Sequence, residues 1–155
     1  MANNYLQFAQ TVEDLTDAEM KWLQSAMAVD DEWEDPENYA DGEFLGGGKG
    51  PPDWYDRDIG GIDFQCEVTP KDRTAHFYAE ESGDVDAVAK LMVAFLRAHR
   101  PNDCFELTYA CTCDKMRSGE FSGGAVFVTA DGYEGHGACT WLDNIRGAWE
   151  RKKSR

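Results

Sequence analysis

The sequence predicts an α+β domain in which a mostly antiparallel five-stranded sheet carries helices on one face. Residues 62–80 contain two alternating strands joined by a turn, which is typical of an antiparallel hairpin. Three other stretches, 17–28, 84–99 and 138–151, repeat apolar residues at helical spacing. The chain has 155 residues, a length that suits a single domain with one core.

The first elements are a short strand and a capped helix. Leu6 and Phe8 alternate with polar neighbours over residues 5–9, which predicts a strand. Thr16 and Glu19 have the spacing of a capping box. The helix should therefore begin at residue 17 and end near 28.

Residues 30–61 form a long segment without the period of a helix or a strand. They begin with a run of acids, have no basic residue before Lys49, and continue into glycines and prolines. Segments of this length inside a domain are usually functional or disordered. Their aromatic residues, Trp33, Tyr39, Phe44, Trp54 and Tyr55, predict a loop that is pinned to the body with its acids outward.

The second half supplies most of the sheet. Strands are expected at 62–69, 74–80, 105–114 and 125–130, with helices at 84–99 and 138–151. The order is β-α-β-β-α-β-β-α, and its first six elements match the ferredoxin-like split βαβ arrangement. One core is expected to contain Phe64, Cys66, Phe77, Phe95, Leu107, Tyr109, Cys111, Phe127 and Trp141.

Acidic side chains dominate the charge of the chain. Thirty Asp and Glu stand against fifteen Lys and Arg, a formal net charge of −15. Four of the basic residues lie in the tail 151–155, so residues 1–150 carry 11 basic and 30 acidic side chains, a net of −19. Such a field repels nucleic acid and anionic membranes and attracts basic protein surfaces, although high charge also serves solubility alone.

Two groups of polar side chains are therefore candidates for binding a partner. One lies in the acidic loop and the other on the open face of the predicted sheet, which antiparallel sheets can leave in water. Together they comprise Asp30, Asp31, Glu32, Glu34, Asp35, Glu37, Asp63, Glu67, His76, Tyr78, Glu80 and Glu106.

No catalytic fingerprint is present. The glycine run 46–50 lacks the spacing and flanking elements of a phosphate loop. Residues 56–67 match part of a calcium-loop template but lack an oxygen ligand at its fifth position. The remaining enzymatic alternative is a small catalytic or metal-dependent site around His76, with Glu67, Glu80 or the cysteines.

The five cysteines, Cys66, Cys104, Cys111, Cys113 and Cys139, cannot all pair within one chain. Cys111 and Cys113 extend an apolar strand face, where free cysteine behaves as a small buried hydrophobe. We expect reduced core thiols that react slowly, with no cofactor and no bound metal. Residues 1–20 lack the pattern of a secretory signal, which favours a cytoplasmic protein.

Three segments carry a resemblance: 78–84 (YAEESGD), 107–113 (LTYACTC) and 119–130 (GEFSGGAVFVTA). They resemble short, uncharacterised acidic proteins of phages, plasmids and other mobile elements. The resemblance covers the C-terminal half and implies no enzymatic activity. It implies a protein that acts on host machinery.

The leading hypothesis is a non-enzymatic binding or inhibitor protein that presents carboxylates to a basic surface. Its partner would be a nucleic-acid-binding protein, and the carboxylates would mimic the phosphates of nucleic acid, as an anti-defence protein could. A third alternative is an acidic domain whose surface charge serves solubility alone. A mimic needs carboxylates spread over a surface, whereas an enzyme needs them converging in a pocket.

Overall fold

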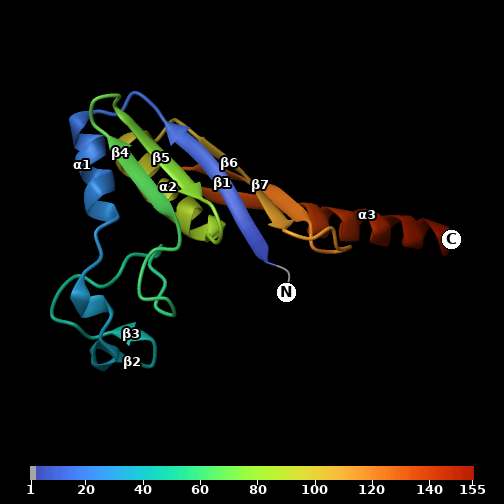
Figure 1. The fold of residues 1–155 in the computed structure, drawn as a ribbon, viewed down its shortest axis with the longest axis horizontal. Helices are drawn as coiled ribbons and strands as arrows, with labels where there is room; N and C mark the ends of the chain where they lie inside the picture. Colours follow the sequence, from blue (N-terminus) through green and yellow to red (C-terminus); the bar gives the residue numbers. More distant parts are fainter. Residues whose placement is uncertain (1–2) are drawn as a thin grey trace.

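The computed structural model describes residues 3–155 and confirms the α+β class (Figure 1). It contains a six-stranded antiparallel sheet, a separate two-stranded hairpin and three α-helices. The elements are β1 (Asn4–Val12), α1 (Asp17–Ala26), β2 (Tyr39–Ala40), β3 (Glu43–Phe44), β4 (Gln65–Thr69), β5 (Thr74–Ala79), α2 (Val85–His99), β6 (Phe105–Cys113), β7 (Ser122–Thr129), β8 (Gly132–Gly137) and α3 (Ala138–Lys153).

The large sheet has the strand order β4-β5-β1-β6-β7-β8, and every neighbouring pair is antiparallel. In the part of the sheet formed by β4, β5, β1 and β6, the two central strands are β5 and β1. α1 lies between β1 and β4 in the chain, and α2 joins β5 to β6. This connectivity is that of a split βαβ unit. β7 and β8 then extend the sheet on the β6 side.

Both helices of this unit begin with side-chain caps. The Thr16 hydroxyl accepts a hydrogen bond from the Glu19 N–H, and the Glu19 carboxylate accepts one from the Thr16 N–H, so the predicted capping box is present. At the start of α2, the Asp84 carboxylate accepts a hydrogen bond from the Ala87 N–H. These caps satisfy backbone donors that the first helical turn leaves unpaired.

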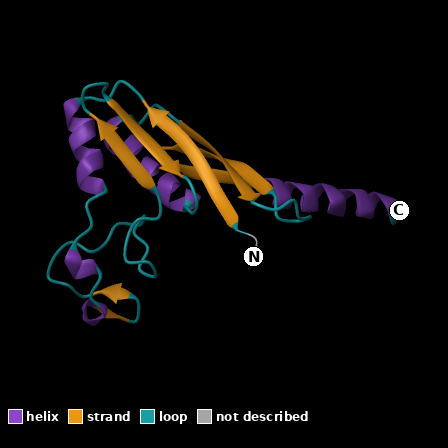
Figure 2. Ribbon diagram, in the orientation of Figure 1, coloured by secondary structure: helices purple, strands orange, loops and turns teal. Residues whose placement is uncertain are grey.

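The hydrophobic core lies between α1 and α2 and one face of the sheet (Figure 2). Its largest fully buried side chains are Leu15, Leu23, Phe77, Val88, Leu91, Met92, Phe95, Leu96, Leu107 and Val128. The Trp22 ring packs edge-on against Phe95, with ring centroids 5.8 Å apart. Aromatic and aliphatic burial of this extent is the main stabilising contribution to such a domain.

The strand count differs from the sequence-based expectation. β8 was not predicted, because its sequence GYEGHG alternates weakly and contains three glycines. β7 begins at Ser122 rather than at 125, since Gly123 and Gly124 are strand residues. The Tyr109 ring crosses the strand there, and a Cβ on Gly124 would lie 2.6 Å from the Tyr109 hydroxyl oxygen. The tiny hairpin β2–β3 was also not predicted.

Two members of the predicted core lie outside it. Phe127 is 47% exposed, because Val126 and Val128 take the helix-covered face and turn Phe127 to the open one. Trp141 is 49% exposed, because α3 leaves the sheet edge instead of packing on it (Figure 1). The helices on one face are thus α1 and α2 alone. Of the remaining predicted core residues, Cys66, Tyr109 and Cys111 are only half-buried.

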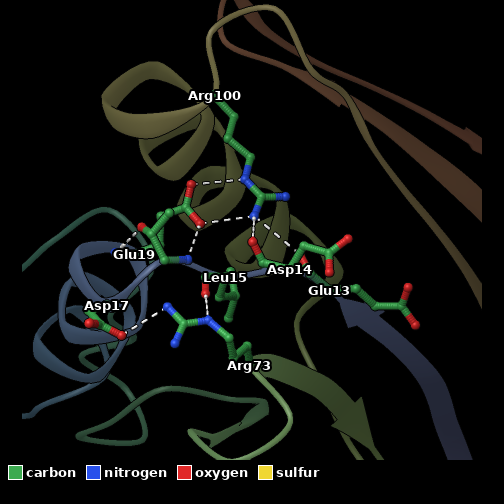
Figure 3. A network of polar contacts seen from close by, with 8 residues as sticks. Glu13, Asp14, Leu15, Asp17, Glu19, Arg73 and Arg100 are labelled. Atoms are coloured by element: carbon green, nitrogen blue, oxygen red, sulfur yellow. Dashed lines mark hydrogen bonds and ion pairs between the residues drawn. The ribbon is translucent and has the colours of Figure 1, made fainter.

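Two arginines fasten the turn between β1 and α1 to the rest of the domain (Figure 3). Arg100, at the end of α2, donates to both carboxylate oxygens of Glu19 and to the carbonyls of Glu13 and Asp14. Arg73, in the β4–β5 turn, donates to the Leu15 carbonyl and to Asp17. Both guanidinium groups therefore stabilise the position of the β1–α1 turn.

None of the helices in residues 3–155 has the length and apolar character required to cross a membrane.

Candidate partner-binding groove

The acids of residues 30–43, which we call the acidic segment, are exposed on a small lobe that lies below the sheet and comes between α1 and β4 in the chain (Figure 1). Two of them have local structural roles. The Asp30 carboxylate accepts a hydrogen bond from the Glu32 N–H, and that of Asp35 accepts one from the Glu37 N–H. They cap single turns of 3₁₀-helix at Asp31–Trp33 and Pro36–Asn38. The other carboxylates of the predicted set, those of Asp31, Glu32, Glu34 and Glu37, are exposed.

Aromatic side chains hold the lobe together. The Trp33 indole N–H donates to the Lys49 carbonyl, and the Tyr39 hydroxyl donates to the Trp33 carbonyl. Arg57 lies over the Tyr39 ring, with its guanidinium carbon 3.5 Å from the ring centroid. Such cation–π contacts contribute about 0.5–1 kcal/mol at exposed sites.

A second set of aromatic contacts joins the lobe to the body. Trp54 donates its indole N–H to the Ala26 carbonyl and contacts the Trp22 ring, with centroids 6.3 Å apart. Trp33 packs edge-on against Tyr55, which is buried. The acidic segment is therefore held in place relative to α1 and the sheet.

An open groove of about 580 Å³ lies where the lobe meets the body. Its lining includes the aromatic residues Trp33, Trp54 and Tyr55. Five carboxylates line it: Glu34 from the lobe, Asp53, Asp56 and Asp58 from the chain leading to β4, and Asp84 at the start of α2. We call this feature the acidic groove. Its basic residues are Arg57, which is engaged by Tyr39, and Lys90 on α2.

Tyr55 gives the groove a buried polar group. Its hydroxyl is buried and has no hydrogen-bond partner among residues 3–155. Burial raises the pKa of this phenol above its ordinary value, and the charge of Glu34 raises it further. The phenol is therefore protonated at neutral pH, and its hydroxyl is enclosed by the protein rather than exposed to the groove.

No family model, curated protein or solved structure matches this chain.

Few of the acids are neutralised by neighbouring bases. Within residues 3–155, ion pairs engage only three of the thirty carboxylates, those of Asp17, Glu19 and Asp143. None of these three belongs to the lobe or the groove. The negative field of the acidic segment and the acidic groove is thus available to a basic partner.

The predicted sheet-face residues do not form one patch. Glu67 and His76 are directly opposite across β4 and β5, and the His76 ring stacks on Tyr78 with centroids 5.1 Å apart. Glu106 instead pairs with Phe127 on β7, toward the other end of the sheet. It lines a separate depression of about 600 Å³ together with Glu134 and His136.

Asp63 and Glu80 lie beside the sheet, not within it. The Asp63 carbonyl accepts a hydrogen bond from the Asp84 N–H, and its carboxylate accepts one from the Ser82 hydroxyl. Glu80 follows the last residue of β5, and its carbonyl accepts a hydrogen bond from the Gln7 side chain. Asp63 therefore positions Asp84, a groove residue.

Of the two acids proposed for an enzymatic site, Glu67 but not Glu80 lies directly opposite His76. The His76 Nδ1 lies 3.1 Å from the Thr11 hydroxyl oxygen, and the depression beside it includes neither Glu67 nor Glu80. Glu80 lines a different depression with Asp63 and Tyr78. Residues 3–155 contain no group of three or more His, Cys, Asp or Glu placed to hold a metal ion.

The cysteines are not all core thiols. Cys113 is buried and Cys66 and Cys111 are half-buried on the covered side of the sheet, but Cys104 and Cys139 are exposed. Burial raises the pKa of the Cys66 thiol to about 12. The expectation of uniformly slow thiols is therefore wrong for Cys104, in the loop before β6, and for Cys139, in the exposed first turn of α3.

Sequence reasoning found the acidic segment but missed most of the groove. Asp53, Asp56 and Asp58 alternate with aromatic and basic residues near Trp54 and Tyr55, a local signal of an acidic aromatic surface. In the sequence, Asp84 indicates only the beginning of a helix. Its place in the groove depends on the contact between the start of α2 and the chain before β4, where the Asp84 N–H donates to the Asp63 carbonyl, and no local pattern encodes that contact.

Proposed function

We propose that this protein is a non-enzymatic binding protein that receives basic side chains of a partner protein in the acidic groove. The observation that carries this proposal is an open groove along which five acidic residues are spread beside Trp33, Trp54 and Tyr55, with no three of the acids gathered at one point. A lysine or arginine entering such a groove gains charge-assisted hydrogen bonds from the carboxylates and cation–π contact with an aromatic face.

The acidic segment extends this surface. Its carboxylates are exposed on one lobe and are spread along two short helical turns. A partner that normally binds the phosphates of nucleic acid presents rows of Lys and Arg, which suit a spread set of negative charges. This supports the finer proposal that the protein competes with nucleic acid for a basic surface in the cytoplasm, as an inhibitor encoded by a mobile element would.

The groove is tested with a fluorescently labelled arginine-rich peptide and fluorescence anisotropy. The variant Asp53→Asn/Asp56→Asn/Asp58→Asn should bind the peptide about tenfold more weakly or worse, because charge-assisted contacts are lost. The matched control Asp103→Asn/Asp131→Asn/Glu150→Gln removes three exposed charges elsewhere. It should bind within about twofold of the wild type, since distant exposed charges are screened. Equal weakening by both variants would reject the groove.

The acidic segment is tested separately with Asp30→Asn/Asp31→Asn/Glu32→Gln/Asp35→Asn, which leaves the groove residue Glu34 unchanged. Asparagine retains the ability to cap a helical turn, so folding should persist. Stopped-flow measurements should show slower association of the peptide and a weaker dependence on salt, because electrostatic steering falls. Association that is equally fast at low and high salt for the wild type would contradict the electrostatic proposal.

Competition with nucleic acid is a third measurement. The peptide is first bound to duplex DNA, and the protein is then added. Release of the DNA by the wild type, but not by the groove variant, is the expected result. Formation of a ternary complex would show that the protein does not compete for the basic surface.

A further inference from the structure

The final helix, α3, leaves the body of the protein. It begins at Ala138, directly after the edge strand β8, and projects beyond the end of the sheet (Figure 1). None of its residues is buried. α3 therefore adds little to the core formed by α1 and α2.

One face of this helix is nevertheless strongly apolar. Trp141, Leu142, Ile145 and Trp149 are 49%, 51%, 52% and 54% exposed, and they lie on one stripe at helical spacing. The Lys153 amine lies 3.6 Å from the centroid of a Trp149 ring and covers only part of that indole. Contiguous exposed apolar surface of this kind marks an interaction site in soluble proteins.

The stripe is symmetric about Ile145. Trp141 and Trp149 lie four residues before and after it, and Leu142 and Ala148 lie three residues before and after it. Two copies of the helix in antiparallel orientation, crossing at Ile145, would therefore place each Trp141 near the Trp149 of the other copy. A two-fold contact requires this self-complementarity, in which residue i meets residue j and residue j meets residue i.

Charge favours the same orientation. Residues 146–155 contain five basic side chains and one carboxylate, whereas residues 138–145 contain one carboxylate, Asp143, and no basic side chain. A parallel pair would bring two basic ends together. An antiparallel pair places each basic end beside the half of the other copy's helix that has no basic side chain, and it aligns the helix dipoles favourably. It also holds the two acidic bodies at opposite ends of the helix pair.

We propose that α3 is a self-association helix that pairs antiparallel with α3 of a second copy through Trp141, Leu142, Ile145 and Trp149. This inference is independent of the proposed basic partner. An interface made by one helix from each copy belongs at the small end of specific interfaces, which bury roughly 800 Å² per partner. Dimerisation should therefore depend on protein concentration.

Analytical ultracentrifugation of the full chain tests association. The wild type should change from monomer to dimer mass between micromolar and near-millimolar concentration. Trp141→Ala/Trp149→Ala should stay monomeric, and its helix should persist, because alanine is a better helix former than tryptophan. The control Thr140→Ala/Glu150→Ala alters the opposite face and should dimerise like the wild type. A monomeric wild type at every concentration would overturn the proposal, as would equal dimerisation of the stripe variant.

Disulfide cross-linking tests the orientation. In a Cys104→Ser/Cys139→Ser background, a mixture of Trp141→Cys and Trp149→Cys chains should form a cross-linked heterodimer, because the antiparallel pair brings these positions together. Each variant alone should cross-link poorly. Efficient cross-linking of Trp141→Cys with itself would indicate a parallel pair and contradict the proposal.

A lipid surface is the alternative occupant for a helix with tryptophans and a basic end. Vesicles of anionic phosphatidylglycerol provide the probe. If the wild type remains monomeric in solution and its tryptophan emission shifts to the blue on adding vesicles, the stripe binds lipid and the self-association proposal fails.

Discussion

Glu19 and Arg100, 81 positions apart in the sequence, form a bidentate ion pair in which Nε and Nη2 of Arg100 each lie 2.9 Å from a carboxylate oxygen of Glu19. Glu19 is almost fully buried, and Arg100 also donates to the carbonyls of Glu13 and Asp14. One guanidinium thus ties the end of α2 to the turn that joins β1 and α1 (Figure 3).

Replacing Glu19 by glutamine should lower the free energy of unfolding by about 2–4 kcal/mol, because it leaves Arg100 without its charged partner in a largely buried site. Asp17→Asn is the matched control, since the Asp17–Arg73 pair is exposed. The control should cost about 1 kcal/mol or less. Urea unfolding measures both, and equal losses would show that burial of the Glu19–Arg100 pair is unimportant.

The same pair should give the protein a distinct acid sensitivity. The hydrogen bond from Arg100 holds the pKa of Glu19 below its ordinary value of 4.5. A carboxyl with a lowered folded-state pKa contributes stability above its unfolded pKa and loses it as pH falls through the folded value. Thermal melts below pH 4.5 should therefore show a shallower pH dependence for Glu19→Gln than for the wild type. Parallel profiles would contradict this linkage.

Two phenylalanines provide a test of the sheet faces. Phe95 is 0% exposed, so Phe95→Ala should lower the free energy of unfolding by about 3–5 kcal/mol through lost transfer energy and a cavity. Phe127→Ala, on the open face, should cost about 1 kcal/mol or less. Chemical denaturation of both variants measures the difference. A large loss for Phe127→Ala would mean that another surface covers it in solution.

The thiols should react in two groups. Cys104 and Cys139 are exposed and should react rapidly with a thiol reagent in the native protein. Buried Cys113 and half-buried Cys66 and Cys111 should react slowly until the protein unfolds, because burial restricts access and raises the pKa of Cys66 to about 12. The variant Cys104→Ser/Cys139→Ser should lose the fast phase, and a remaining fast phase of two thiols would contradict the assignment.

Local patterns were sufficient for most of the elements. The Thr16–Glu19 capping box fixed the start of α1, and alternation placed β4 and β5 as an antiparallel pair. Alternation could not predict which face Phe127 takes, because residues 125–128 (AVFV) are apolar on both sides of the strand. It also failed at β8, where glycines carry no side-chain pattern.

The sequence by itself determined the α+β class, the acidic character of residues 30–43 and the apolar stripe of α3. Only the tertiary structure decided that Asp84 and Glu34 line one groove and that Arg100 forms an ion pair with Glu19. It also decided that no other element covers the apolar stripe of α3. The reason is physical. Periodicity shows which side of an element is apolar or charged, but the element that covers that side is set by contacts between residues far apart in the chain.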